Sequence, residues 1–113
     1  MNITLEKSQK FAIRIYDLYK NLYDEKHEHV LSKHLLNSGT SIGANLAEAQ
    51  YSVSRNDYIL RTKTSLKECA ETEYWLNLLK DVNLLSQDEY ADIIVDCREI
   101  LRLLTVTVKA AIT

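Results

Sequence analysis

Hydrophobic residues recur at helical spacing along four stretches of the chain. In the first stretch, from about Leu5 to Glu25, they lie four, three and four positions apart: Phe11, Ile15, Leu18 and Leu22. In the second, from about Val30 to Tyr51, they follow a similar spacing: Leu31, Leu35, Ile42, Leu46 and Ala49. Side chains at such spacings share one face of an α-helix. The polar run 24–29 separates the two stretches, so the sequence predicts a pair of amphipathic helices.

The third and fourth stretches begin with helix-capping residues. Ser54 is followed by Asp57, which places a hydroxyl and a carboxylate near the exposed N–H groups of a first turn. Ser86 and Glu89 form the pattern of a capping box. The third helix is predicted to end near Lys80, with these residues facing inward: Tyr58, Thr62, Leu66, Cys69, Leu76 and Leu79. The fourth helix continues to the C-terminus, with these residues facing inward: Tyr90, Ile94, Cys97, Leu101, Leu104 and Val108.

Four helices joined by short connections predict one all-α domain over residues 1–113, an antiparallel up-down-up-down four-helix bundle. Two glycines and no proline are too few turn residues for an all-β fold, and 46% hydrophobic residues with a net charge of −2 argue against disorder. No 18-residue apolar run is present, and charges at the N-terminus interrupt any signal-peptide core. We therefore expect a cytoplasmic protein with no membrane contact.

Charge is divided unevenly between the two halves of the chain. Residues 1–63 hold nine Lys and Arg against seven Asp and Glu, whereas residues 64–113 hold five against nine. The acidic C-terminal half argues against a protein coated in nucleic acid, on which a basic surface should dominate. A local basic patch in the N-terminal half stays open as an interface for RNA or DNA, and its candidates are Lys7, Lys10, Arg14 and Lys20.

Both glycines of the chain lie inside the second predicted helix, where each costs about 0.5–1 kcal/mol relative to alanine. Gly39, Gly43 and Ala47 are four positions apart and form a smooth stripe that lets another helix backbone approach closely. Hydroxyl and amide groups near the stripe are suited to bonding across such a contact: Ser38, Thr40, Ser41 and Asn45. We therefore predict a tight, partly polar seam between two helices.

This region resembles the signature of a known family. The matching segments are Ser38-Gly-Thr-Ser-Ile-Gly-Ala-Asn45, Glu48-Ala49, Asp57-Tyr58-Ile59, Lys63, Ser65-Leu66-Lys67-Glu68 and Glu71-Thr72-Glu73-Tyr74-Trp75-Leu76. They are similar to motifs of the four-helix-bundle proteins that are also called 23S ribosomal RNA intervening-sequence proteins. The resemblance implies a bacterial antiparallel bundle of unknown function that assembles into a homopentamer. It also implies a relative in the accessory variability determinant of retroelements, a pentamer that binds reverse transcriptase and nucleic acid.

The chain departs from that pattern at a few points. Cys69 stands where the family commonly has alanine, and His34 stands where glutamine is common. The retroelement relative is markedly basic, whereas this chain is mildly acidic. The nucleic-acid activity of the relative is therefore not carried over to this chain.

Charged residues of the third helix are further candidates for a site. Four of them lie at helical spacings: Lys63, Lys67, Glu68 and Glu71. Lys67 and Glu71 form a pair of opposite charge one turn apart. Together with Asn45 and Glu48 of the second helix, we expect these residues to form a polar network inside the bundle or between subunits. A solvated helix surface is the alternative.

The sequence offers little support for catalytic, metal or cofactor chemistry. A phosphate loop requires a lysine after its last glycine, and no lysine follows Gly43. The Glu-x-x-His pairs of a di-iron bundle are also absent from the sequence. Three histidines have spacings that suit neither one helix face nor a zinc finger: His27, His29 and His34. Cys69 and Cys97 lie in apolar patterns and are expected to be buried thiols, with a disulfide or redox pair as the alternative. We predict no enzyme activity, no cofactor and no bound metal.

Aromatic and apolar residues outside the helix stripes point to self-association. Three tyrosines of the first helix suit a wet subunit interface, with base stacking as the alternative: Tyr16, Tyr19 and Tyr23. A 113-residue monomer has difficulty covering all the apolar residues that lie outside a single stripe: Ile13, Tyr16, Leu36, Trp75 and Leu78. We expect a homo-oligomeric binding or scaffolding protein whose main partner is itself. A nucleic-acid-binding accessory protein that uses the basic N-terminal half is the alternative.

Overall fold

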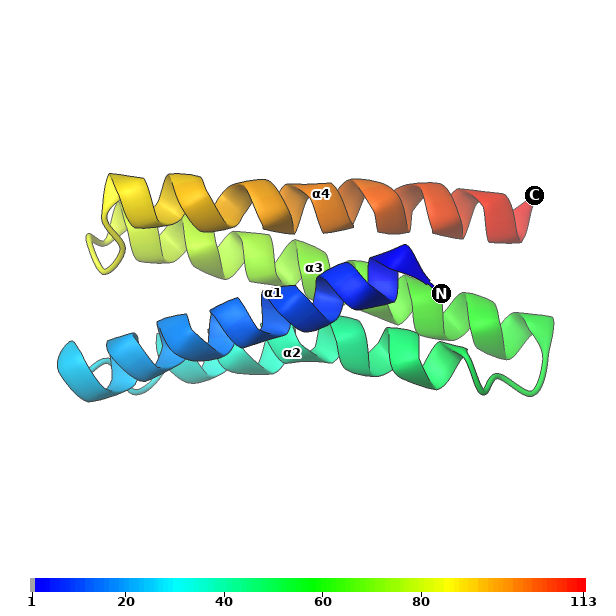
Figure 1. The fold of residues 1–113 in the computed structure, drawn as a ribbon, viewed down its shortest axis with the longest axis horizontal. Coiled ribbons are helices and arrows are strands. Elements are labelled where there is room, and N and C mark those ends of the chain that lie inside the picture. Colours follow the sequence, from blue (N-terminus) through cyan, green and yellow to red (C-terminus); the bar gives the residue numbers. More distant parts are fainter. Residues whose placement is uncertain (1) are drawn as a thin grey trace.

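The computed structural model describes residues 2–113, which form four long helices packed side by side. In chain order they are α1 (Ile3–Lys20), α2 (Leu31–Ala49), α3 (Arg55–Asp81) and α4 (Gln87–Ile112). Successive helices run in opposite directions, and the bundle measures 44 × 22 × 20 Å (Figure 1). No strand occurs in residues 2–113, so the predicted all-α antiparallel four-helix bundle is confirmed.

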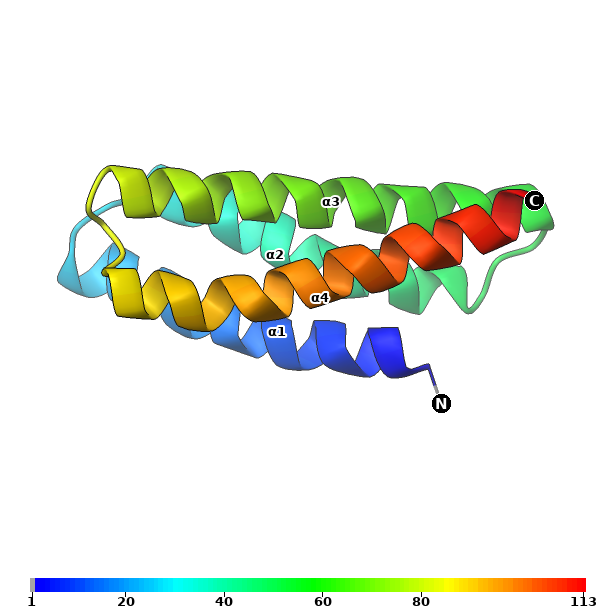
Figure 2. The same cartoon turned by 90° about the horizontal axis from the view of Figure 1, so that it is seen from above.

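The helices pack in the order of the chain, and α4 returns to lie beside α1. Figure 2 shows α4 close to α1 at its N-terminal end and leaning towards the start of α3 at its C-terminal end. There, Arg55 donates a hydrogen bond to the Ala111 carbonyl oxygen. No helix of the described part of the chain is long and apolar enough to cross a bilayer.

Local capping explains where the helices begin. The Ser54 hydroxyl accepts a hydrogen bond from the Asp57 N–H at 3.1 Å, and Ser86 and Glu89 complete the predicted capping box. Asn2 caps α1, which therefore begins two residues earlier than predicted. The start of α2 is capped by Glu28, whose carboxylate accepts from two N–H groups of the first turn.

The end of α1 differs from the prediction of one continuous helix to residue 25. The α-helix ends at Lys20 and continues as a π-helical turn, η1 (Asn21–Glu25). The chain then reverses at His27, which has a φ of 55°. Asn83, in the connection before α4, has a φ of 64°, and asparagine tolerates this left-handed conformation better than most residues.

The core combines the predicted apolar faces with a buried polar layer between α2 and α3. The largest fully buried side chains include Phe11, Ile15, Leu22, Leu35, Ile42, Leu76, Leu79, Ile100 and Leu104. The Thr72 hydroxyl lies 3.0 Å from the Ser38 hydroxyl, and Ser65 donates to the Ile42 carbonyl oxygen at 2.8 Å. Every buried side-chain nitrogen or oxygen of residues 2–113 has a hydrogen-bond partner. These small polar residues therefore fill the core without leaving an unpaired donor or acceptor.

Tyr58 lines a small cavity beside Leu46 and Leu104 of the core, but it is less buried than predicted. Its side chain is 36% exposed, because it lies in the first turn of α3 at the open end of the bundle, just beyond the end of α2. Conversely, Ile93 and Ile100 were not among the predicted inward positions but are buried in the core. The inward face of α4 is therefore wider than a single apolar stripe indicated.

Candidate interaction surfaces

The glycine stripe of α2 is the surface on which α1 packs. Gly39 and Gly43 are buried. A Cβ atom added at Gly39 would lie 2.7 Å from Ile15 Cγ2, and one added at Gly43 would lie 3.5 Å from Ser8 Cβ and 3.7 Å from the Ser8 carbonyl carbon. Ile15 and Ser8 are themselves completely buried. The close helix approach predicted from the glycines is therefore present, and its partner is α1.

The polar groups near this stripe do not bond across the α1–α2 contact as predicted. Thr40, Ser41 and Asn45 all bond to carbonyl oxygens one turn back in α2, at 2.7, 2.6 and 2.8 Å respectively. Ser38 does reach a neighbouring helix, but that helix is α3, where it meets Thr72. The α1–α2 seam therefore depends on close packing, whereas Ser38 forms its inter-helix hydrogen bond at the α2–α3 contact.

The four basic candidates of the N-terminal half do not form a free basic patch. Each lies against a carboxylate of the same chain: Lys7 on Glu99 at 2.8 Å, Lys10 on Glu6 at 3.5 Å, Lys20 on Asp24 at 3.7 Å, and Arg14 on both Asp92 and Asp96. Two of the four, Lys7 and Arg14, pair with α4, between 78 and 92 residues away in sequence. The spacing of the basic residues along α1 could not reveal these ion pairs, because the pairs depend on which helix packs beside α1.

These contacts join the basic side of α1 to the acidic side of α4. Lys26, in the connection after α1, extends the series by approaching Glu89 to 3.6 Å. The hydrogen bond with Glu99 raises the pKa of Lys7, and the same bond lowers the pKa of Glu99. Basic residues of the N-terminal half of the chain therefore pair with acidic residues of the C-terminal half. Such exposed ion pairs are screened by salt.

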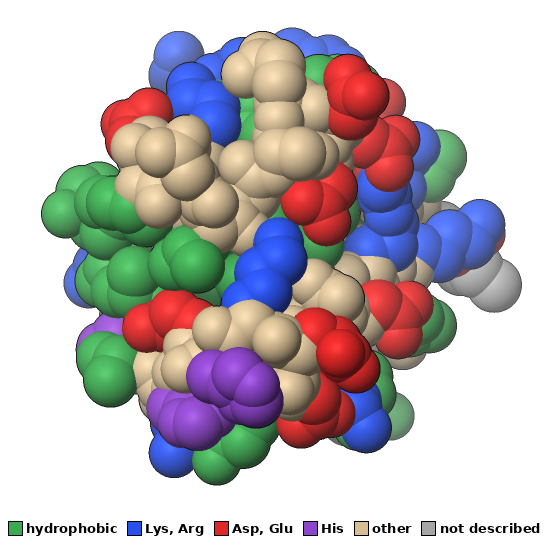
Figure 3. Space-filling view, turned by 90° about the vertical axis from the view of Figure 1, so that its left-hand side faces the viewer, with side chains coloured by type: hydrophobic (Ala, Val, Ile, Leu, Met, Phe, Trp, Pro, Cys, Tyr) green, Lys and Arg blue, Asp and Glu red, His purple; other side chains and the backbone are tan. Residues whose placement is uncertain are grey.

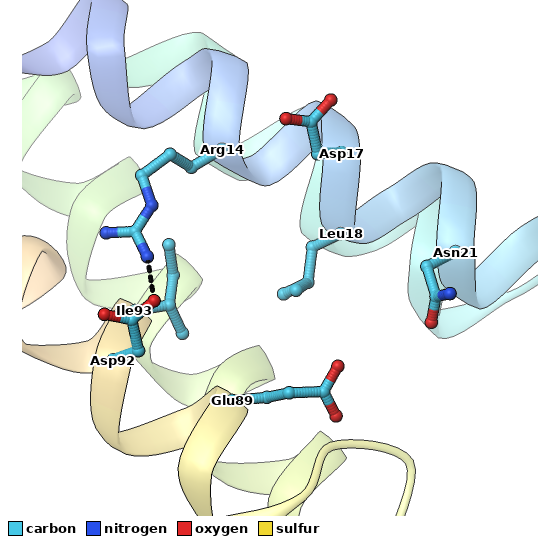
Figure 4. A pocket seen from close by; sticks show the side chains of 7 residues that line it. All are labelled: Arg14, Asp17, Leu18, Asn21, Glu89, Asp92 and Ile93. Carbon is cyan, nitrogen blue, oxygen red and sulfur yellow. Dashed lines mark hydrogen bonds and ion pairs between the residues drawn. The ribbon is translucent and has the colours of Figure 1, made fainter.

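Two cavities lie along this charged contact. The larger has a volume of about 360 Å³ and is lined by Arg14, Asp17, Leu18, Asn21, Glu89, Asp92 and Ile93 (Figure 4). The smaller, of about 130 Å³, is lined by Lys7, Lys10, Phe11, Asp96, Glu99 and Ile100. Figure 4 shows Arg14 reaching from α1 to Asp92 of α4, while Asp17 points away from α4. The charged groups at the larger cavity are therefore partly neutralised by one another.

The predicted polar network of α3 is not formed within one chain. Lys63, Lys67 and Glu71 are exposed, and no ion pair among residues 2–113 joins them to one another or to Glu68. Glu71 instead accepts a hydrogen bond from the Trp75 indole at 3.0 Å.

The other members of the expected network also bond elsewhere. Glu48 pairs with Arg61 at 2.8 Å, and Asn45 bonds within its own helix. Partial burial, assisted by the charge of Glu71, raises the pKa of Glu68. In a single copy, the alternative of a solvated helix surface therefore describes Lys63, Lys67 and Glu71.

Aromatic side chains form two separate groups on the surface. Along the edge of α1, the ring centroids of Tyr16, Tyr19, Tyr23 and His29 follow one another at 6.3, 5.5 and 4.2 Å. In the second group, the ring of His34 on α2 stacks on that of Trp75 on α3, with centroids 4.7 Å apart. The three histidines thus do not converge, and no three His, Cys, Asp or Glu side chains of the described residues are grouped as metal ligands would be.

Cys69 and Cys97 face each other across the α3–α4 contact. Both are free thiols and both are completely buried. Each sulfur approaches the carbonyl oxygen of the other cysteine, at 3.4 and 3.8 Å. Hydrogen bonding to Cys69, together with burial, raises the pKa of Cys97 well above its usual range. The prediction of buried thiols is confirmed, and a raised pKa leaves little reactive thiolate.

Several large apolar side chains remain outside the core. Ile13 is 63% exposed and Tyr16 is 49% exposed on α1, while Leu60 is 60% exposed and Tyr74 is 58% exposed on α3. Figure 3 views the bundle from the end that carries the α1–α2 and α3–α4 connections, and hydrophobic side chains gather on one side of it, away from the mixed acidic and basic side. At this end of the bundle, hydrophobic side chains therefore lie apart from most of the charged ones.

Comparisons with known proteins agree with this architecture. The model of the 23S rRNA-intervening sequence protein family matches residues 2–106. A crystal structure of a protein of unknown function from the S23 ribosomal protein family of Bacteroides thetaiotaomicron is 46% identical, covers 96% of each chain and superposes with a TM-score of 0.93. No curated protein matches the chain. The chain therefore belongs to the family of 23S rRNA-intervening sequence proteins.

Proposed function

We propose that this protein is a homo-oligomeric helical scaffold that acts by binding rather than by catalysis. The apolar surface left outside the core carries the proposal. Four side chains on two helices are about half exposed or more: Ile13, Tyr16, Leu60 and Tyr74. Large exposed apolar side chains of this kind favour a protein interface, because removing them from water is favourable. Association of copies would cover them without any further partner.

The copy number that we propose is five, as the family resemblance implies. A ring of identical subunits uses two different surfaces of each copy, since the contact runs from one subunit to the next. The apolar positions of α1 and those of α3 lie on separate helices that do not pack on each other, so the chain offers two such surfaces. This arrangement supports a closed ring.

A nucleic-acid-binding accessory role has weaker support. Phosphate groups bind to free lysine and arginine side chains, and releasing counterions from such contacts drives the association. Here the four candidates already contact carboxylates of their own chain, and two of them, Lys7 and Arg14, would have to leave α4 to reach a phosphate. Binding to RNA or DNA would therefore compete with contacts that help hold α1 against α4.

Light scattering after gel filtration tests the scaffold proposal directly. At micromolar concentration we expect a mass that is a multiple of the 13.1 kDa chain, with five copies per ring. A monomer would refute the scaffold, and a ring of another size would refute only the copy number. In parallel, retention of structured RNA that weakens steeply with salt would favour the nucleic-acid alternative.

A further inference from the structure

The two cysteines of the chain lie opposite each other in the contact between α3 and α4. Cys69 and Cys97 are both 0% exposed. The Cys69 sulfur lies 3.4 Å from the Cys97 carbonyl oxygen, and the Cys97 sulfur lies 3.8 Å from the Cys69 carbonyl oxygen. Because the contact is reciprocal, each side chain lies over the backbone of the residue that carries the other thiol. The two cysteines therefore face each other directly and are not staggered along the helices.

The two thiols also contact each other. Hydrogen bonding with Cys69 is the largest cause of the raised pKa of the Cys97 thiol, and burial is the next. The short S–S bond of a disulfide cannot join side chains that point apart without moving the backbone. Side chains that point at each other from two packed helices have the orientation that this bond requires.

Side-chain contacts between α3 and α4 hold the cysteines at the same level. Glu73, four residues after the first cysteine, accepts a hydrogen bond at 2.8 Å from Arg98, which follows the second cysteine. Further along, the Tyr90 hydroxyl donates to the Asn77 side chain. Sliding one helix past the other would break both bonds. The register that places the thiols opposite each other is therefore fixed by contacts outside the pair.

The surroundings leave the two thiols mainly with each other as reaction partners. No group of three His, Cys, Asp or Glu side chains in residues 2–113 could complete a metal site around them. Burial also keeps dissolved reagents away from both sulfurs in the closed bundle. A reagent reaches them when the α3–α4 contact opens locally, and closing then brings the sulfurs together again.

We propose that Cys69 and Cys97 form a reversible disulfide that links α3 to α4 when the surroundings become oxidising. The oxidant is a low-molecular-weight disulfide of the glutathione class. One cysteine thiolate attacks it, forms a mixed disulfide and releases one small thiol, and the second cysteine thiolate then displaces the other. The pair gives two electrons to the oxidant, and the two cysteine protons end on the two released thiols. The bond lies within one chain and does not depend on the proposed self-association.

The disulfide would make the stability of the bundle depend on its redox surroundings. It closes a loop that contains the end of α3, the connection and the start of α4. Closing such a loop stabilises a protein mainly by restricting the unfolded chain. We expect the melting temperature of the oxidised protein to lie roughly 10 °C above that of the reduced protein.

Equilibration with glutathione tests the pair. The full chain is incubated in mixtures of reduced and oxidised glutathione a few degrees below its melting temperature, where local opening exposes the thiols. After trapping, a mass that is smaller by two hydrogen atoms identifies the disulfide. The same chain kept unfolded in guanidinium chloride gives the reference. By linkage, a fold that stabilises the bond by the usual amount should favour the disulfide about 100-fold over the unfolded chain.

Cys69→Ala is the matched control, because it removes one sulfur and keeps a small apolar side chain. This variant can gain a glutathione but cannot lose two hydrogens, and oxidised glutathione should not raise its melting temperature. On a denaturing gel without reductant, the oxidised protein should run as a single chain. A disulfide that is no more favourable in the folded protein than in the unfolded chain, or one that joins two chains, would overturn the inference. Neither result bears on the scaffold, which light scattering tests separately.

Discussion

Two glycine-to-alanine substitutions on the same face of α2 should change stability in opposite directions. Gly39 and Gly43 are one helical turn apart, and both are buried against α1. In each case alanine improves helix propensity by about 0.8–1 kcal/mol. The two positions differ in the space that the structure leaves for the added methyl group, and that difference decides the sign.

At Gly39 the methyl group has no room. Its carbon would lie 2.7, 3.0 and 3.2 Å from three side-chain atoms of Ile15, a completely buried residue whose branched side chain cannot easily rotate away. Overpacking of a core costs about 1–3 kcal/mol, and three short contacts place this site in the upper part of that range. After the gain in propensity, Gly39→Ala should lose about 1–2 kcal/mol of unfolding free energy.

At Gly43 the methyl group fits. Its closest neighbour would be Ser8 Cβ at 3.5 Å, which is an ordinary van der Waals contact. The gain in propensity then remains, and Gly43→Ala should stabilise the protein by about 0.5–1 kcal/mol. A protein of this size changes its melting temperature by roughly 4 °C for each kcal/mol, so the two variants should differ by about 6–12 °C.

Chemical denaturation followed by circular dichroism, at one protein concentration, measures both changes. Light scattering of the same samples should give equal masses, so that the comparison is not affected by a change in assembly. The reasoning fails if Gly39→Ala is as stable as the unmodified protein. It also fails if the unfolding free energies of both variants change in the same direction, because the contacts with α1 would then not determine the effect of an added methyl group.

Two further substitutions test other local contacts. Gly43→Leu should lower the free energy of unfolding by about 1–3 kcal/mol, because a side chain larger than a methyl group would collide with the Ser8 backbone, and a rise in melting temperature would contradict this. Glu89→Gln should make the stability of the folded protein less sensitive to acid. The hydrogen bond from the Ser86 N–H, with help from Lys26, lowers the pKa of Glu89 in the folded protein. The stability that this carboxylate contributes is therefore fully present above its unfolded pKa of about 4.3 and is lost as the pH falls through its lower folded pKa. Thermal melts between pH 5 and pH 2 should thus fall less steeply for Glu89→Gln, while at pH 7 the loss should be about 0.5 kcal/mol or less, since glutamine also serves in a capping box. If the melting temperatures of the variant and the unmodified protein fall equally with pH, the Glu89 carboxylate does not cause the loss of stability in acid.

The helices, their capping and the need for one close helix contact follow from local features of the residues. Ser54, Ser86 and Glu89 act on N–H groups within three or four residues, so the starts of α3 and α4 could be predicted from local chemistry. The apolar spacing of α1 and α2 likewise depends only on the geometry of one helix. The two glycines indicated that something packs closely on α2, because their cost in helix propensity requires a compensating contact.

Which helix surfaces meet depends on the packing of the whole bundle and could not be predicted from local patterns. Local spacing did not reveal that α1 is the helix seated on the glycines, or that Arg14 lies against Asp92 and Asp96 of α4. The π-helical turn at the end of α1 also escaped prediction. Helical periodicity states which residues share a face, but it does not state which helix that face will contact. That depends on the direction in which each connection sends the chain, and on close packing among side chains as far apart in sequence as Lys7 and Glu99, which are 92 positions apart.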